Sequence, residues 1–124
     1  MLKVYNGTPH AINIVANGGF NPEIRKYVAE NPEIIATIPS NGVLSAKIDT
    51  LPDMSINDIP VFTKSISGCD ELPEGYDIYV VSALYVSAAR SVGMDTSKLY
   101  TVADPVYSLD GRTILGSRGI CPAF

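Results

Sequence analysis

The sequence predicts an α+β domain, in which a mostly antiparallel β-sheet of about six to eight strands carries one or two helices on one face. Short β-branched and aromatic runs recur between Gly, Pro and Asn turn signals, as is typical of strands. One such run leads directly into a segment with helical spacing. The 124 residues suffice for one domain with its own core, so residues 1–124 are expected to form a single domain.

The chain is organised around a strand–helix junction at Asp77–Val92. Asp77–Val81 is an apolar run typical of a buried strand, and Ser82 is a favoured helix N-cap. Apolar residues then recur near helical spacing until Gly93 supplies a C-terminal stop. The helix N-terminus is suited to an anion because its N–H groups are unpaired, although an ordinary capped end explains the same residues.

The N-terminal half is expected to contain two hairpins and a second helix. Leu2–Tyr5 and Ala11–Val15 are predicted strands of a hairpin or meander around Asn6-Gly7. Asn21 and Pro22 resemble a helix start, so Pro22–Glu30 is predicted as a short amphipathic helix. Further expected elements are strands at Glu33–Ile38 and Val43–Asp49 paired around Asn41-Gly42, a polar loop at Leu51–Asp58, and a strand at Ile59–Ile66.

The C-terminal third is expected to end in a hairpin and a tail. Leu99–Val102 is a predicted short strand, and Asp104-Pro105 marks a corner. Val106–Ser108 and Arg112–Leu115 flank an Asp-Gly turn and are predicted to pair. The remaining residues, Ile120–Phe124, are interpreted as a tail.

The net charge and its distribution argue against general nucleic-acid binding and assign any anionic ligand to the C-terminal third. The net charge is −4, which argues against general DNA binding. Residues 1–84 hold five Lys/Arg and ten Asp/Glu, whereas residues 85–124 hold four and three, so an anion should meet the C-terminal third. No apolar run suggests a signal peptide or a membrane span. Cys69 and Cys121 are far apart and are expected to be free thiols in a reducing cytoplasm.

Signatures of catalysis are weak. His10 is a single histidine beside a turn, and such residues are more often structural than catalytic. No Cys, His and Asp pattern has metal-ligand spacing, and Gly111, Gly116 and Gly119 form no phosphate-binding fingerprint. We therefore expect a binding protein without cofactor or metal rather than an enzyme.

Several residues are better suited to binding. Tyr85 lies one turn into the helix, where its ring could stack on a base or pack into the core. Arg112 and Thr113 follow the Asp-Gly turn and could clamp a pyrophosphate or form a solvated tip. Arg118 lies between two glycines, where the backbone can approach a ligand closely, or it belongs to a mobile tail. Arg25 is a weaker candidate for ligand binding.

The helix that follows Ser82 has unusually small side chains, including Ala88 and Ala89. Small side chains permit close approach of another subunit, or tight packing on the chain's own sheet. Self-association through this helix is therefore one of two explanations for the pattern.

A set of motifs in order along nearly the full chain resembles a family of small bacteriophage proteins. The motifs are Leu2–His10, Ile38–Gly42, Ile59–Val61, Tyr79–Leu84, Ala103–Val106 and Asp110–Gly119. The pattern is similar to that of the Thoeris anti-defence sponges of the first class. Such sponges sequester, without cleavage, the cyclic ADP-ribose isomers made by bacterial TIR immune proteins. The resemblance implies action in the host bacterial cytoplasm.

The resemblance also implies partners and site residues. Family members are homo-oligomers built from dimers with ligand pockets between subunits, and some hold cyclic di- or trinucleotides in a second pocket. The aromatic residue of the family's pocket matches Tyr85, and its Arg-Thr pair matches Arg112 and Thr113. A polar residue after the helix corresponds to Asp95 or Thr96, and an upstream arginine corresponds to Arg25. The competing hypotheses are an enzyme that degrades such a signal and a phage protein that binds another protein.

Overall fold

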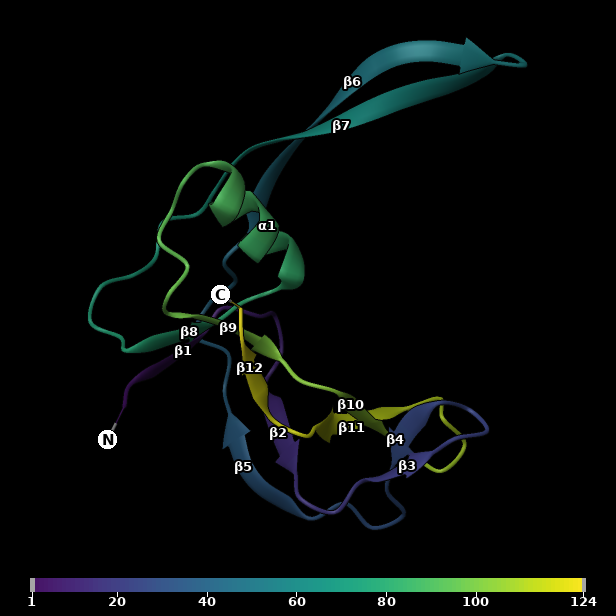
Figure 1. Cartoon of the computed structure of the whole chain (residues 1–124), viewed down its shortest axis with the longest axis vertical. Coiled ribbons are helices and arrows are strands. Elements are labelled where there is room, and N and C mark those ends of the chain that lie inside the picture. The colour runs from purple at the N-terminus through teal and green to yellow at the C-terminus, as the bar shows by residue number, and fades with distance from the viewer. Residues whose placement is uncertain (1, 124) are drawn as a thin grey trace.

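The computed structural model describes residues 2–123 and is mostly β, with 47% of residues in strands and one short helix. The twelve strands of these residues form two mixed sheets and a separate two-stranded ribbon (Figure 1). The expectation of a β-rich fold with a helix is thus confirmed in its coarse form. The strands do not form one sheet, and the two larger sheets are mixed rather than purely antiparallel, because each contains parallel pairs.

The first sheet has the strand order β1-β8-β9-β12. Its strands are β1 (Val4–Asn6), β8 (Ile78–Val80), β9 (Leu99–Val102) and β12 (Ile120–Pro122). β8 pairs in parallel with both β1 and β9, while β12 is antiparallel to β9. The strand–helix junction is confirmed: β8 leads into α1 (Ala83–Ser91), and the Ser82 hydroxyl accepts a hydrogen bond from the Tyr85 N–H at 3.1 Å.

The second sheet has the order β3-β4-β10-β11-β2-β5. Its strands are β2 (Ile12–Val15), β3 (Gly19–Asn21), β4 (Lys26–Val28), β5 (Ile34–Ile38), β10 (Pro105–Tyr107) and β11 (Ile114–Ser117). The hairpin predicted around the Asp-Gly turn is confirmed, because β10 and β11 pair antiparallel. This hairpin joins β4 on one side and β2 on the other, in parallel in both cases.

The two-stranded ribbon, which we call the arm, is formed by β6 (Ala46–Ile56) and β7 (Ile59–Cys69). It extends away from the rest of the chain, and α1 lies beside its base (Figure 1). Asn57 and Asp58 form its turn with φ of 49° and 64°, the positive values that a tight two-residue hairpin turn requires.

Two apolar clusters hold the body together. The larger one lies between α1 and the first sheet and contains Tyr5, Leu44, Tyr79, Val81, Tyr85, Val86, Ala89 and Leu99. The smaller one lies on the second sheet and contains Val15, Ala29 and Val106. Within residues 2–123, no helix is long and apolar enough to span a membrane.

The helix predicted at Pro22–Glu30 is wrong. Residues 22–25 form a turn between β3 and β4, and Arg25 has a φ of 55°, which a right-handed helix does not contain. The pairing of β4 with β10 and the edge-to-face contact of Phe20 with Tyr27 stabilise the strand conformation instead.

Both hairpins predicted in the N-terminal half are also wrong. β1 and β2 belong to different sheets, and β5 pairs with β2 rather than with β6. Asn6 explains the first error, because it is a buried end of β1 whose amide group donates to the carbonyls of His10 and Ile38, both at 3.0 Å. These side-chain bonds direct the chain away from a tight turn.

Two further segments differ from the prediction. Leu51–Asp58, expected as a loop, completes β6 and the turn of the arm, because its residues pair with β7 almost to the tip. The expected tail forms β12, with Cys121 paired to Thr101 of β9. Phe124 lies outside the described residues.

Candidate functional site

A pocket lined by cationic and aromatic side chains lies where β3, β4 and β10 meet. We call it the cationic pocket; its volume is about 320 Å³. Its lining consists of Phe20, Arg25, Lys26, Tyr27, Asp104, Pro105 and Tyr107. Segments from both ends of the chain form it, because the parallel pairing of β4 with β10 brings them together.

Cation–π contacts fix two of the positive charges. The Lys26 ammonium lies 4.4 Å from the centre of the Tyr107 ring and donates to the Gly111 carbonyl at 2.9 Å. The Arg118 guanidinium borders the pocket, because it lies 4.3 Å from the centre of the Tyr27 ring. These charges are therefore held in place rather than left on freely rotating side chains.

The pocket is electropositive despite the acidic charge of the whole chain. Arg25, Lys26 and Arg118 contribute three positive charges, and Asp104 contributes one negative charge. Asp104 pairs with Arg118 at 3.2 Å, and both side chains are about half exposed. Such a site can attract a phosphate or pyrophosphate while its aromatic rings contact a base or sugar.

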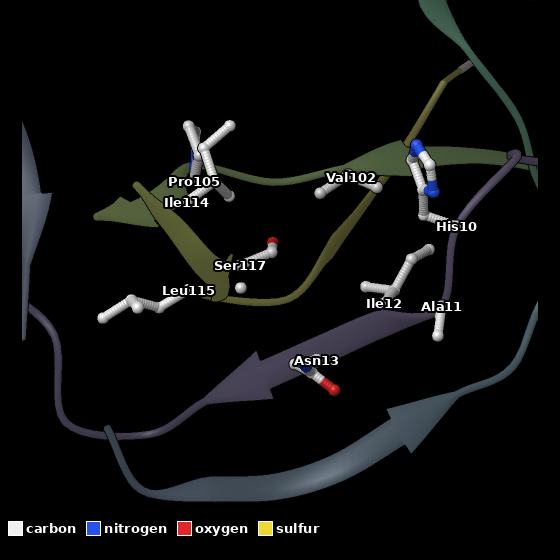
Figure 2. Close-up of a pocket in the computed structure, with 10 residues that line it drawn as sticks. His10, Ala11, Ile12, Asn13, Val102, Pro105, Ile114, Leu115 and Ser117 are labelled. Atoms are coloured by element: carbon white, nitrogen blue, oxygen red, sulfur yellow. The ribbon is translucent and has the colours of Figure 1, made fainter. Parts of the chain in front are cut away.

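A second, more apolar pocket of about 410 Å³ lies between β2, β11 and the segment that joins β9 to β10 (Figure 2). It is lined by His10, Ala11, Ile12, Asn13, Val102, Pro105, Ile114, Leu115, Gly116 and Ser117. Two of its polar groups are engaged within the chain: Ser117 bonds to the Gly119 carbonyl at 2.7 Å, and Asn13 accepts from Thr37 at 2.9 Å. The pocket therefore suits a small apolar or planar group, and Pro105 lines both pockets.

The structure brings together two of the residues chosen from the sequence. Arg25 lines the cationic pocket and Arg118 borders it, although they lie far apart in the chain. The alternative that Arg118 lies in a mobile tail does not fit, because its N–H donates to the Asp104 carbonyl at 3.0 Å and its side chain has two partners.

Arg112 and Thr113 lie on the exposed turn of the β10–β11 hairpin. In the sequence they stand between a residue that contacts the cationic pocket and a residue that lines the apolar pocket. The preceding residue, Gly111, bonds to Lys26 of the cationic pocket, and the following residue, Ile114, lines the apolar pocket. The Arg112 N–H donates to the Asp110 carboxylate at 3.0 Å. The Ser108 hydroxyl and the Arg112 N–H both bond to the Asp110 carboxylate and lower its pKa. The charged form of Asp110 therefore stabilises the turn.

Tyr85 is not part of either pocket. Its side chain is 0% exposed, and its hydroxyl donates to the Asp70 carbonyl at 2.5 Å. Burial raises the pKa of the phenol, and the nearby Cys69 and Asp70 raise it further. This placement agrees with the core-packing alternative, because a fully covered ring has no face for a base.

Asp95 and Thr96 lie in the loop between α1 and β9, which contributes no residue to either pocket. The Asp95 carboxylate accepts from the Ser97 N–H at 2.9 Å, and this bond lowers the pKa of Asp95. The Thr96 carbonyl accepts from the Leu99 N–H at 3.1 Å. Both residues thus shape the entry into β9.

Sequence reasoning missed most of the cationic pocket. The helix predicted over Pro22–Glu30 hid Lys26 and Tyr27, and no local motif marks Phe20 or Tyr107. The signal that could have found them is the concentration of aromatic and cationic residues at 20–27. Among residues 2–123, no group of three or more His, Cys, Asp or Glu side chains could hold a metal ion.

Searches of known protein families, curated proteins and solved structures found no match to this chain.

Proposed function

We propose that this protein binds and sequesters, without cleaving it, a cyclic ADP-ribose isomer in the cytoplasm of a phage-infected bacterium. The observation that carries the proposal is the cationic pocket, in which Arg25, Lys26 and Arg118 surround aromatic rings. A cyclic ADP-ribose isomer combines a pyrophosphate with an adenine base, so it matches this combination of charge and aromatic surface. The motif resemblance to the Thoeris anti-defence sponges supports the same ligand class.

The arrangement favours holding a ligand over hydrolysing it. The described lining of the cationic pocket contains one carboxylate, Asp104, and this group is engaged with Arg118. His10, the single histidine, lines the apolar pocket instead. General acid–base chemistry at a phosphate needs a proton-transferring group within hydrogen-bond reach, and the cationic lining offers mainly permanent positive charge.

A release experiment tests this function. The purified protein is incubated with a cyclic ADP-ribose isomer, freed of unbound ligand, denatured by heat, and the supernatant is analysed by chromatography. Recovery of intact ligand in proportion to protein supports sequestration. A new product would replace the proposal with a degrading enzyme, and no retained ligand would favour a protein that binds another protein.

A matched pair of variants assigns the binding to the pocket. Lys26→Ala removes a pocket charge, and Lys47→Ala removes an exposed charge on the arm. We expect Lys26→Ala to lower affinity by about 1.5–3 kcal/mol, the usual range for a hydrogen bond to a charged group. Lys47→Ala should leave affinity unchanged. Equal affinities of both variants would contradict the assignment of the ligand to this pocket.

A further inference from the structure

The apolar pocket adjoins the cationic pocket, and the proposed function leaves it without a role. Pro105 lines both pockets. It pairs with Ser117 of β11, which lines the apolar pocket, and the next residue, Val106, pairs with Tyr27 of β4, which lines the cationic pocket. In the order of the sheet the two pockets are therefore neighbours across β10, and a ligand that crosses this strand at Pro105 can reach both.

The cationic pocket leaves little surface for a nucleobase. The Lys26 ammonium and the Arg118 guanidinium lie over the rings of Tyr107 and Tyr27, at 4.4 Å and 4.3 Å from the ring centres. The Tyr27 ring also packs against the smaller apolar cluster and meets Phe20 edge to face. Stacking of a base needs an open ring face. The pyrophosphate and a ribose can therefore contact the cations and the ring edges, but the base needs a further surface.

The volume of the cationic pocket supports the same conclusion. It is about 320 Å³, near the lower limit of the roughly 300–1,000 Å³ that is typical of ligand pockets. A cyclic ADP-ribose isomer contains two riboses, a pyrophosphate and a purine. A ligand of this size extends beyond the cationic pocket, and the apolar pocket is the adjoining space.

The apolar pocket has the size and lining for a base. Its volume is about 410 Å³, and its walls are mainly aliphatic, with Ile12, Val102 and Pro105 around the space in Figure 2. Gly116 allows β11 to come close to β2 there, because a Cβ atom at this position would lie 2.5 Å from the Asn13 carbonyl oxygen. Aliphatic side chains pack against the faces of a flat ring, so a purine can bind here without a charged partner.

His10 supplies a hydrogen-bonding group at one end of the apolar pocket. Its side chain is exposed, and Figure 2 shows its ring at the same end of the pocket as Val102. Within residues 2–123 the bonds recorded for His10 go from Asn6 and Thr8 to its backbone carbonyl, so its ring is available to a ligand. A neutral imidazole donates from one nitrogen and accepts at the other, so it can meet either the N7 acceptor or the N6 donor of adenine. This end of the pocket therefore suits the polar edge of the base.

We propose that the two pockets are two parts of one ligand site. The pyrophosphate lies among the positive charges of the cationic pocket, and the adenine lies in the apolar pocket with its polar edge toward His10. The ribose between them crosses β10 at Pro105. This assignment rests on the proposed function, since it places the parts of a cyclic ADP-ribose isomer. The two contacts reinforce each other, because the second forms within a complex that already exists.

A matched pair of variants on the second sheet tests the role of the apolar pocket. Ile114 lines this pocket and Ile35 of β5 is absent from the described lining of both pockets, yet both side chains are 62% exposed. Ile114→Asn makes the wall polar without adding a charge, so calorimetric titration with a cyclic ADP-ribose isomer should show an affinity about three- to tenfold lower. Ile35→Asn should bind like the unmodified chain, and circular dichroism checks that both variants are folded. Equal affinities of the two variants would overturn the proposal, while sequestration of the ligand would still stand.

Fragments of the ligand test the assignment on the unmodified chain. In amide NMR spectra, adenosine should shift the signals of residues that line the apolar pocket, and inorganic pyrophosphate should shift those of the cationic pocket. A saturating concentration of one fragment should leave the binding of the other unchanged. His10→Ala should weaken the binding of adenosine and leave that of pyrophosphate unchanged.

The outcomes separate this proposal from the proposed function. The absence of adenosine shifts in the apolar pocket, or competition between the two fragments, would overturn the two-part site. Failure of the proposed function has a different signature, because the intact isomer would then not be retained in the release experiment.

Discussion

Asp104 provides a test in which removal of a charge should strengthen binding. Among the described residues that line the cationic pocket it is the one carboxylate, and it pairs with Arg118 at 3.2 Å. Asp104→Asn keeps the shape of the side chain and removes its negative charge. A pyrophosphate bound in the pocket would no longer be repelled by this carboxylate and would no longer compete with it for Arg118.

The size of the effect follows from Coulomb's law. Two like unit charges about 6 Å apart repel by about 0.7 kcal/mol at a dielectric constant of about 80 and by about 2.8 kcal/mol at about 20. Because Asp104 and Arg118 are 57% and 48% exposed, the lower part of that range applies. We therefore expect affinity to rise roughly three- to tenfold.

Folding should be little affected by the same substitution. A half-exposed ion pair contributes only about 0–1 kcal/mol to the free energy of unfolding. The bond from the Arg118 N–H to the Asp104 carbonyl belongs to the backbone and remains in the variant. A change in affinity would thus report on charge in the pocket rather than on loss of structure.

Calorimetric titration with a cyclic ADP-ribose isomer at low and high salt measures the effect. Arg118→Ala is the variant of opposite sign and should lower affinity by about 1.5–3 kcal/mol, because it removes a charge-assisted contact. Both changes should shrink as salt increases. Weaker binding by Asp104→Asn would refute the reasoning, since it would mean that the carboxylate contacts the ligand favourably.

Three further predictions follow from the turn of the β10–β11 hairpin and from the core. Arg112→Ala should weaken ligand binding by about 1.5–3 kcal/mol and change the free energy of unfolding by no more than about 0.5 kcal/mol. Arg112→Lys should have an intermediate affinity, because an ammonium lacks the planar fork of a guanidinium. Indistinguishable titrations of the unmodified chain and the two variants would exclude a role for Arg112. Tyr85→Phe should lower the free energy of unfolding in urea by about 1–3 kcal/mol, since the Asp70 carbonyl loses its donor, and should leave ligand affinity unchanged; unaltered stability would contradict the burial argument. The lowered pKa of Asp110 means that its charged form stabilises the folded turn. The protection of the Arg112 amide against hydrogen exchange, taken relative to the intrinsic rate at the same pH, should therefore fall as pH falls below about 4, through the range in which Asp110 gains a proton. The same loss of protection in Asp110→Asn would assign it to another group.

Elements controlled by local sequence were predictable. Each of these signals acts over a few residues: the Ser82 cap, the helical spacing after it, and the Asp-Gly turn before Arg112. The structure forms α1 and the β10–β11 hairpin at the positions that these signals predict. The spacing of Ile24, Tyr27 and Val28 is compatible with a helix, and it is equally compatible with a turn followed by a strand. Pairing with β10, far along the chain, decides between them, and no local pattern contains that information.

The candidate site was predictable only in part for the same reason. Arg25 and Arg118 were each selected from the sequence, but their convergence depends on the parallel pairing of β4 and β10. Tyr85 illustrates a different limit. An aromatic residue near a helix start has the same local signature whether its ring faces the core or a ligand, and only the packing of Leu44, Val81 and Leu99 around it separates the two.

The parallel pairing of β1 with β8 has a consequence for how the chain acquires its structure. The Lys3 N–H donates to the Asp77 carboxylate, 74 residues further along, and the strand that pairs with β1 is β8, so β1 cannot join its sheet until β8 has been synthesised. The arm, by contrast, pairs residues that are close in sequence and can form first. Folding of the first sheet is therefore expected to be slow and to occur late during translation, with completion only after β12 has left the ribosome.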